Sequence, residues 1–130
     1  IAFLFPKVGL SGADMGASWL LPRIVGHGRA SELLFLGDFV SAEVAERIGL
    51  YNRIVPAESL RADAYALAKR LAEGPAFAHA MTKKMLDYEA QVDFLTGIEA
   101  EAQAQAICMQ HPDFRAAYDA SVEKRPPRFE

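Results

Sequence analysis

The chain has 130 residues, a formal net charge of −3, 52% hydrophobic residues and 24% charged residues. These values are typical of one globular domain, and the acidic total disfavours binding to the phosphates of a nucleic acid. The sequence has no run of 18 apolar residues, so we predict no membrane-spanning helix. A single cysteine, Cys108, excludes an internal disulfide and suits a reducing compartment, so we expect a cytoplasmic protein.

Residues 3–16 contain a short apolar run followed by a glycine-rich loop. The apolar residues 3–5 are predicted to end a buried strand, which Pro6 stops. The glycines of the loop allow positive φ angles or a close approach of the backbone to a ligand. Asp14 lies in this loop, just before a predicted helix. A carboxylate at that position either caps the helix or carries out chemistry, and both hypotheses stay open at this point.

Short elements follow the loop. Pro22 lies deep in the first predicted helix and is expected to kink or restart it, because proline removes a backbone donor. Gly37 is predicted to cap the C-terminus of the second helix, and Ser41 the N-terminus of the third. The predicted elements are helices over residues 16–25, 29–36 and 42–48 and a short strand over residues 53–55 that Pro56 closes.

From Glu58 onward, apolar residues recur at spacings of three and four, which predicts four amphipathic helices. We therefore divide the chain into an α/β part over residues 1–56 and a helical module over residues 57–130. Surplus apolar helical surface should pack on the α/β part or on a neighbouring subunit. Met81, Met85 and Met109 are predicted to lie in the core and not in a cofactor site, and Cys108 is predicted on an apolar helix face.

The order of several motifs resembles the C-terminal half of the enoyl-CoA hydratase/isomerase (crotonase) family, over nearly the whole chain. The motifs are FLFPKVGLSGADMGASWLLPRIVG over residues 3–26, ELLFLGD over 32–38, SAE to IGL over 41–50, NRIVP over 52–56, TKK over 82–84 and EKRPP over 123–127. The resemblance implies the end of a crotonase-type β/α spiral core followed by a C-terminal helical module. It also implies an additional amino-terminal half upstream of Ile1, which agrees with a sequence that opens within a predicted strand.

The resemblance implies chemistry on an acyl-CoA thioester. Family enzymes hold the thioester carbonyl between two backbone N–H groups, which stabilise the enolate that forms. Both of those segments, and the first of the two glutamates of a hydratase, would lie upstream of Ile1. Coenzyme A is then part of the substrate, and no separate cofactor is expected. The three histidines, His27, His79 and His111, have no metal-ligand spacing, so no metal site is predicted.

The second hydratase glutamate would follow Pro6, but this chain has Lys7 there. Lysine cannot handle a proton as a carboxyl group, which argues against hydration by two glutamates. Lys7 is either a solvated strand end or a contact to an anion of CoA or of the substrate. Asp14 matches the loop acid of dienoyl-CoA isomerases, where it is an acid/base, and of 4-chlorobenzoyl-CoA dehalogenases, where it is the nucleophile. Proton transfer by Asp14 is the favoured role.

Other residues are predicted to bind substrate. Gly12 and Ala13 would bring their backbone close to it, and Trp19 is expected in the core or in a pocket wall. Lys124, in a basic C-terminal cluster, is either a solvated helix end or, by the resemblance, a contact to the CoA phosphates. The family assembly implies a homotrimer or a dimer of trimers. The competing hypothesis is a non-catalytic fragment that serves as an oligomerisation or acyl-CoA-binding module.

Overall fold

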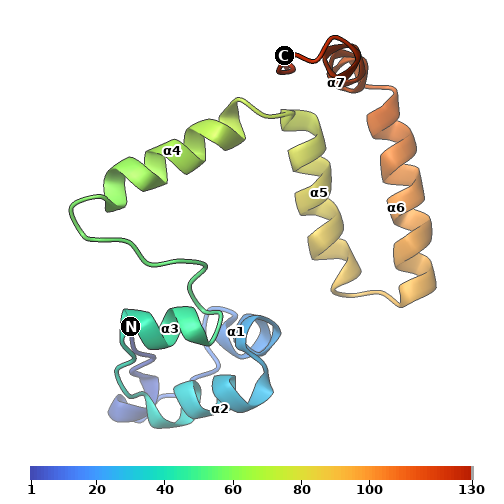
Figure 1. The fold of residues 1–130 in the computed structure, drawn as a ribbon. Helices are drawn as coiled ribbons and strands as arrows, with labels where there is room; N and C mark the ends of the chain where they lie inside the picture. The colour runs from blue at the N-terminus through green and yellow to red at the C-terminus, as the bar shows by residue number, and fades with distance from the viewer. Residues whose placement is uncertain (130) are drawn as a thin grey trace. The chain divides into compact units, whose positions relative to one another are not determined.

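A computed structural model describes residues 1–129 of the chain. Every regular element in this range is helical, and no strand occurs in it (Figure 1). None of these helices combines the length and the apolar character needed to cross a membrane. The elements are one 3₁₀-helix, η1 (Phe5–Val8), and the α-helices α1 (Ala17–Val25), α2 (His27–Leu36), α3 (Ala42–Arg47), α4 (Leu60–Ala72), α5 (Ala76–Glu89), α6 (Phe94–Met109) and α7 (Pro112–Val122).

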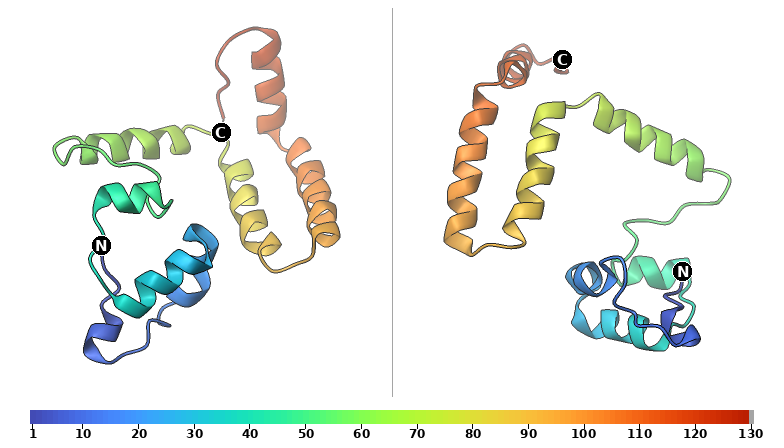
Figure 2. Two further views of the ribbon diagram at one scale, coloured as in Figure 1. Left: turned by 60° about the horizontal axis from the view of Figure 1, so that its bottom comes forward. Right: turned by 180° about the vertical axis from the view of Figure 1, so that it is seen from behind.

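The chain forms two compact units, Ile1–Glu58 and Ser59–Glu130. In the first unit, α1 and α2 pack side by side, and η1 also contacts α2 (Figure 2). Three buried residues, Leu21, Ala30 and Leu33, form the centre of its core. Partly buried apolar side chains surround this centre: Phe3, Val25, Leu34, Val40, Ile48 and Leu50.

The strand predicted over residues 3–5 is wrong. Pro6 occupies the first turn of η1, where its fixed φ and missing N–H are tolerated. Ile1 and Val40 exchange two backbone hydrogen bonds, of 2.9 and 2.8 Å, but the pairing does not continue. A strand is stable only when neighbouring strands pair with it, and residues 1–129 supply no such ladder to this segment.

The strand predicted over residues 53–55 is also absent from the described chain. Its Ile54 N–H donates instead to the Glu46 carboxylate at 2.9 Å, so a side chain replaces a strand partner. The α/β prediction for residues 1–56 is therefore corrected to an all-helical arrangement in the described residues. The apolar composition of such short segments favours burial of their side chains but does not reveal the partner of their backbone.

Pro22 does not restart the first helix, because α1 runs from Ala17 to Val25 with proline inside it; a kink at Pro22 stays a prediction. The Arg23 guanidinium donates to the Trp19 carbonyl at 2.7 Å in the same turn. Pro22 has no backbone N–H to donate, and the Arg23 side chain supplies a donor to a main-chain carbonyl in the same part of the helix. The predicted caps of the neighbouring helices are confirmed: Gly37 ends α2 with φ 62°, and the Ser41 hydroxyl accepts from the Val44 N–H.

The second unit confirms the four predicted helices. Helices α5 and α6 lie antiparallel and in contact, and α6 also contacts α7 (Figure 1). The side chains of Asp93 and His111 cap the N-termini of α6 and α7. Few apolar side chains are buried in this unit; Ala104 and Ala120 are the clear cases. Many large ones are exposed, including Leu60, Tyr65, Leu71, Leu86, Phe94, Leu95, Tyr118 and Val122, as the predicted surplus of apolar surface requires.

Candidate functional site

The loop of residues 9–16 joins η1 to α1, and its path depends on glycine. Gly9 ends η1 with a φ of 75°, and Gly16 precedes α1 with a φ of 84°. Both angles lie in the left-handed region that other residues avoid. Met15 also has a positive φ of 47°, and its side chain is 93% exposed. The Ser11 hydroxyl accepts from the Ala13 N–H at 3.1 Å, which tightens the middle of the loop.

Asp14 does not cap α1, so that hypothesis is wrong. Gly16 is the N-cap residue, and the main-chain carbonyl of Asp14 accepts from the Ala17 N–H at 2.8 Å. Within residues 1–129 the Asp14 carboxylate has no hydrogen-bond or ion-pair partner, and the residue is exposed. The Asp14 side chain is therefore available to a bound ligand, just before the N-terminus of α1.

The same loop borders a cavity of about 370 Å³ in the first unit. Backbone and small side chains of the loop form one wall, and α1 and α2 form the others. Gly12 and Ala13, both predicted substrate contacts, line this cavity. The remaining lining residues are Ser11, Ser18, Pro22, His27, Ala30, Ser31, Leu34 and Phe35, which combine hydroxyl groups and an imidazole with apolar surface.

Lys7 is neither at a strand end nor unpaired. Its ammonium donates to the Asp38 carboxylate, with 2.8 Å between Nζ and Oδ1. Lys7 lies in η1, and Asp38 follows the C-terminal glycine of α2, so the ion pair links two segments that are 31 residues apart in sequence. Both side chains are more than half exposed, which limits the intrinsic strength of the pair.

Trp19 is not a core residue of the described chain, because it is 44% exposed. The Arg23 guanidinium lies over its indole ring, 3.7 Å from the ring centroid. Residues four apart on a helix share a face, so this cation–π contact fixes the indole along α1. The other predicted role of Trp19, as a pocket wall, stays a prediction.

Lys124 lies in the second unit, directly after the C-cap residue of α7. Its φ is 55°, and its N–H donates to the Ser121 carbonyl while the next N–H donates to Ala120. This pair of bonds is a Schellman motif, in which glycine is the usual residue. The exposed side chain agrees with a solvated helix end, and a contact with CoA phosphates stays a prediction.

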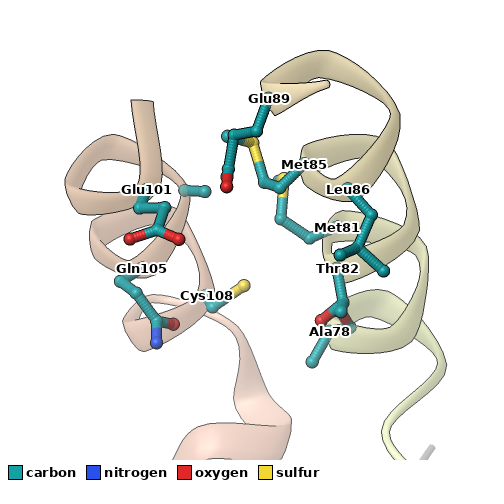
Figure 3. A pocket seen from close by; sticks show the side chains of 10 residues that line it. Ala78, Met81, Thr82, Met85, Leu86, Glu89, Glu101, Gln105 and Cys108 are labelled. Carbon is teal, nitrogen blue, oxygen red and sulfur yellow. The ribbon is translucent and has the colours of Figure 1, made fainter. Parts of the chain in front are cut away.

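A second hollow lies between α5 and α6 and encloses about 300 Å³ (Figure 3). Met81 and Met85 extend from α5 toward α6, and Cys108 extends from α6 toward α5. These three side chains are half-buried, which agrees with the helix-face prediction for Cys108 but leaves Met81 and Met85 outside the buried core of the described residues. Met109 is mostly exposed, so its predicted core position is wrong for the described residues. Glu89 and Glu101 add carboxylates to the lining of the hollow.

The sequence does not indicate which residues hold Lys7 and Trp19. Asp38 pairs with Lys7 and Arg23 lies over Trp19, and neither partner is among the predicted site residues; His27 lines the cavity although the sequence suggested no role for it beyond metal binding, which its spacing disfavours. The spacing of four between Trp19 and Arg23 on a predicted helix could have indicated their contact. The pairing of Lys7 with Asp38 has no such signal, because it depends on how α2 folds back on η1.

Comparison with known proteins places these residues in a family. The model of the enoyl-CoA hydratase/isomerase family matches residues 1–130. The 1,2-epoxyphenylacetyl-CoA isomerase of Escherichia coli (strain K12) is 34% identical over 125 residues, which cover 96% of this chain and 47% of that protein. The crotonyl-CoA hydratase of Syntrophomonas wolfei is 33% identical over 125 residues, which cover 95% of this chain and 48% of that protein.

A solved structure agrees. A solved structure from Streptomyces coelicolor A3(2), described as an enoyl-CoA hydratase, superposes on this chain with a TM-score of 0.96. The two chains are 48% identical, and the match covers 99% of this chain and 47% of that one. The chain thus spans about half the length of the curated relatives it matches. The helices of the described chain correspond to part of the fold of this solved structure.

Proposed function

The chain belongs to the enoyl-CoA hydratase/isomerase family, and we propose that it is part of an acyl-CoA enzyme in which Asp14 moves a proton at an unsaturated acyl-CoA thioester. The observation that carries this proposal is the state of the Asp14 carboxylate. It is exposed, has no partner within residues 1–129 and lies on a loop that borders a cavity. The carboxylate does not cap α1, so no hydrogen bond within the described residues competes with a bound substrate for it.

The proposed reaction is a migration of a double bond. The Asp14 carboxylate takes a proton from a carbon adjacent to the double bond, and the electron pair moves through the conjugated system onto the thioester oxygen. Backbone N–H groups, which the family pattern places upstream of Ile1, would stabilise that negative charge. The enolate then collapses and recovers the proton from Asp14 at a different carbon, so that one group acts first as base and then as acid.

Isomerisation fits the residues of this chain better than hydration by two carboxyl groups. Lys7 stands where a hydratase of the family would have its second glutamate, and its ammonium is paired with Asp38. An ammonium cannot accept a proton from water. One relative is named an isomerase and another a hydratase, at nearly equal identity, so the proposal depends on Asp14 and Lys7 and not on those names.

Replacing Asp14 by Asn in the full protein tests this role. Asn keeps the shape of the side chain but cannot take up a proton, so kcat on an enoyl-CoA ester should fall by a factor on the order of 10² to 10⁴. The matched control is Asp87→Asn, which removes a carboxylate from α5 and should keep the parental rate. Thermal unfolding and binding of the CoA ester should be unchanged in both variants. An Asp14→Asn enzyme that turns over at the parental rate would show that this carboxylate moves no proton.

A non-catalytic module is the second candidate, favoured by the exposed apolar surface of residues 59–129. Those helices would then serve a homotrimer, or a dimer of trimers, without turnover. Native mass spectrometry of the purified protein, followed by an assay on several enoyl-CoA esters, separates the two candidates. Assembly without conversion of any ester supports the module, and conversion supports the enzyme.

A further inference from the structure

We propose that α2 positions the loop of residues 9–16, which carries Asp14. Gly12 and Lys7 are the positioning residues through which α2 acts. The proposal rests on the role of Asp14 as the group that moves the proton. It differs from the substrate contacts predicted for these two residues, because each acts here through a partner on or next to α2.

The first point of attachment is the contact of Gly12 with Leu34 of α2. A Cβ at residue 12 would lie 2.9 Å from the Leu34 carbonyl oxygen and 3.0 Å from the Leu34 Cβ. The nearest of these atoms belongs to the backbone of a helix, so a different rotamer of Leu34 cannot make room. Gly12 does not have a positive φ, so its requirement is for space and not for a special backbone conformation.

The second point of attachment lies at the start of the loop. A Cβ at Gly37, the last cap residue of α2, would lie 2.9 Å from the Phe3 carbonyl oxygen and from the Pro6 Cγ. The η1 segment is therefore pressed against this end of α2. The adjacent ion pair between Lys7 and Asp38, at 2.8 Å, holds the two segments together from the outside.

Asp14 follows the first point by two residues and precedes α1 by three. A displacement of Gly12 from α2 is passed along this short stretch to the Asp14 carboxylate. Proton transfer requires its two heavy atoms at hydrogen-bond distance, and misplacement by about 1 Å can cost on the order of 10²-fold in rate. Gly12 thus influences the rate without touching the reacting atoms.

The decisive experiment compares Gly12→Ala with Gly28→Ala in the full protein. Gly28 lies in α2, without a positive φ and with no atom within 4 Å of an added Cβ, so it is a matched control. Gly12→Ala should lower kcat by roughly 10- to 100-fold with KM nearly unchanged, and it should speed amide hydrogen exchange of residues 9–16. Gly28→Ala should change neither. Parental kcat, or parental exchange, in Gly12→Ala overturns the proposal.

A charge exchange tests Lys7. Lys7→Asp alone places two carboxylates together, so exchange of residues 9–16 should increase and kcat should fall by roughly two- to five-fold. The double variant Lys7→Asp with Asp38→Lys restores an ion pair and should restore both quantities. If Lys7 contacts an anion of the CoA ester instead, the double variant keeps a raised KM, and the positioning role of Lys7 is wrong.

The hydrogen-exchange measurement separates this inference from the proposed function. It reports the attachment of the loop whether or not the protein is active. An active Asp14→Asn variant refutes the proton-transfer role, and the positioning role falls with it even where exchange confirms the attachment. An inactive Asp14→Asn variant together with a fully active Gly12→Ala variant refutes only the positioning by α2.

Discussion

The two units of this chain reach their structures by different means. The first unit has a small apolar core around Leu21 and Leu33, and its loops are fixed by backbone contacts that only glycine permits. The second unit buries little apolar side chain, and its helices are defined by caps and periodicity. The first unit is therefore held partly by contacts between segments far apart in sequence, such as Ile1 with Val40 and Lys7 with Asp38, whereas the second is held by contacts between neighbouring helices, α5 with α6 and α6 with α7.

The difference between the two units agrees with the proposed function. Asp14, Gly12 and Ala13 lie on the loop of the unit whose backbone is held by tertiary contacts, which suits a group that must be placed accurately. The second unit presents long apolar faces, which suits a surface that packs against something else. This division supports the proposed assignment of chemistry to the first unit and of assembly to the second.

The largest expected difference between the two units is in the free energy of unfolding lost when a leucine is replaced by alanine. Leu33 is 7% exposed, so Leu33→Ala removes buried apolar surface and leaves a cavity, at a cost of roughly 2–5 kcal/mol. Leu86 in α5 is 69% exposed, and Leu86→Ala should change stability by less than about 0.5 kcal/mol. Denaturant unfolding followed by circular dichroism measures both values.

Equal losses of stability in Leu33→Ala and Leu86→Ala would contradict the contrast between a buried core in the first unit and exposed apolar faces in the second. A large cost for Leu86→Ala would mean that the α5 face carrying it is covered in the protein in solution. Repeating the measurement over a range of protein concentrations shows what covers this face. A stability cost that grows with concentration indicates that a second copy of the chain packs there.

The same contrast explains what the sequence could and could not predict. The four helices of the second unit follow from their own apolar spacing, and the caps at Gly37 and Ser41 are local, so both were predicted. Residues 3–5 and 53–55 have the composition of strands, but a strand depends on neighbours that their own sequence does not reveal. Their prediction failed for that reason.

The candidate site divides in the same way. The glycine-rich loop and its acid are visible in the sequence, and so is the departure at Lys7. The ion pair with Asp38 and the contact of Gly12 with Leu34 are not, because both need the fold of α2 on the loop. The sequence therefore predicted the candidate acid, Asp14, but not the contacts that hold its loop.

A smaller and pH-dependent effect should appear at the α6 cap. The Thr96 hydroxyl, at 2.6 Å, and then the Thr96 N–H lower the pKa of Asp93 below its ordinary value of 3.8. A carboxyl whose pKa is lower in the folded state stabilises the fold above its unfolded pKa, and this contribution is lost as the pH falls through the folded value. Asp93→Asn should therefore lower Tm at neutral pH, with the gap to the parent closing in acid below about pH 4.

Thermal unfolding of the parent and of Asp93→Asn across that pH range measures the gap. Asp87→Asn, which removes a carboxylate from α5 but no cap, is the control and should show no such closure. A gap that stays constant into strong acid would mean that the Asp93 carboxylate is not what caps α6.

The smallest expected effect is a gain in stability, at the end of α7. Lys124 adopts a φ of 55°, and a non-glycine residue in this region is strained by roughly 1–3 kcal/mol. Lys124→Gly removes that strain but adds freedom to the unfolded chain, worth about 0.5–1 kcal/mol, so the expected net gain lies between about 0 and 2.5 kcal/mol, with a middle value near 1 kcal/mol. Lys124→Ala removes the same charge and keeps the strained backbone, so it should give no gain in denaturant unfolding. If the alanine variant is stabilised as much as the glycine variant, the gain comes from the lost charge, and the Schellman backbone at this position is not under strain.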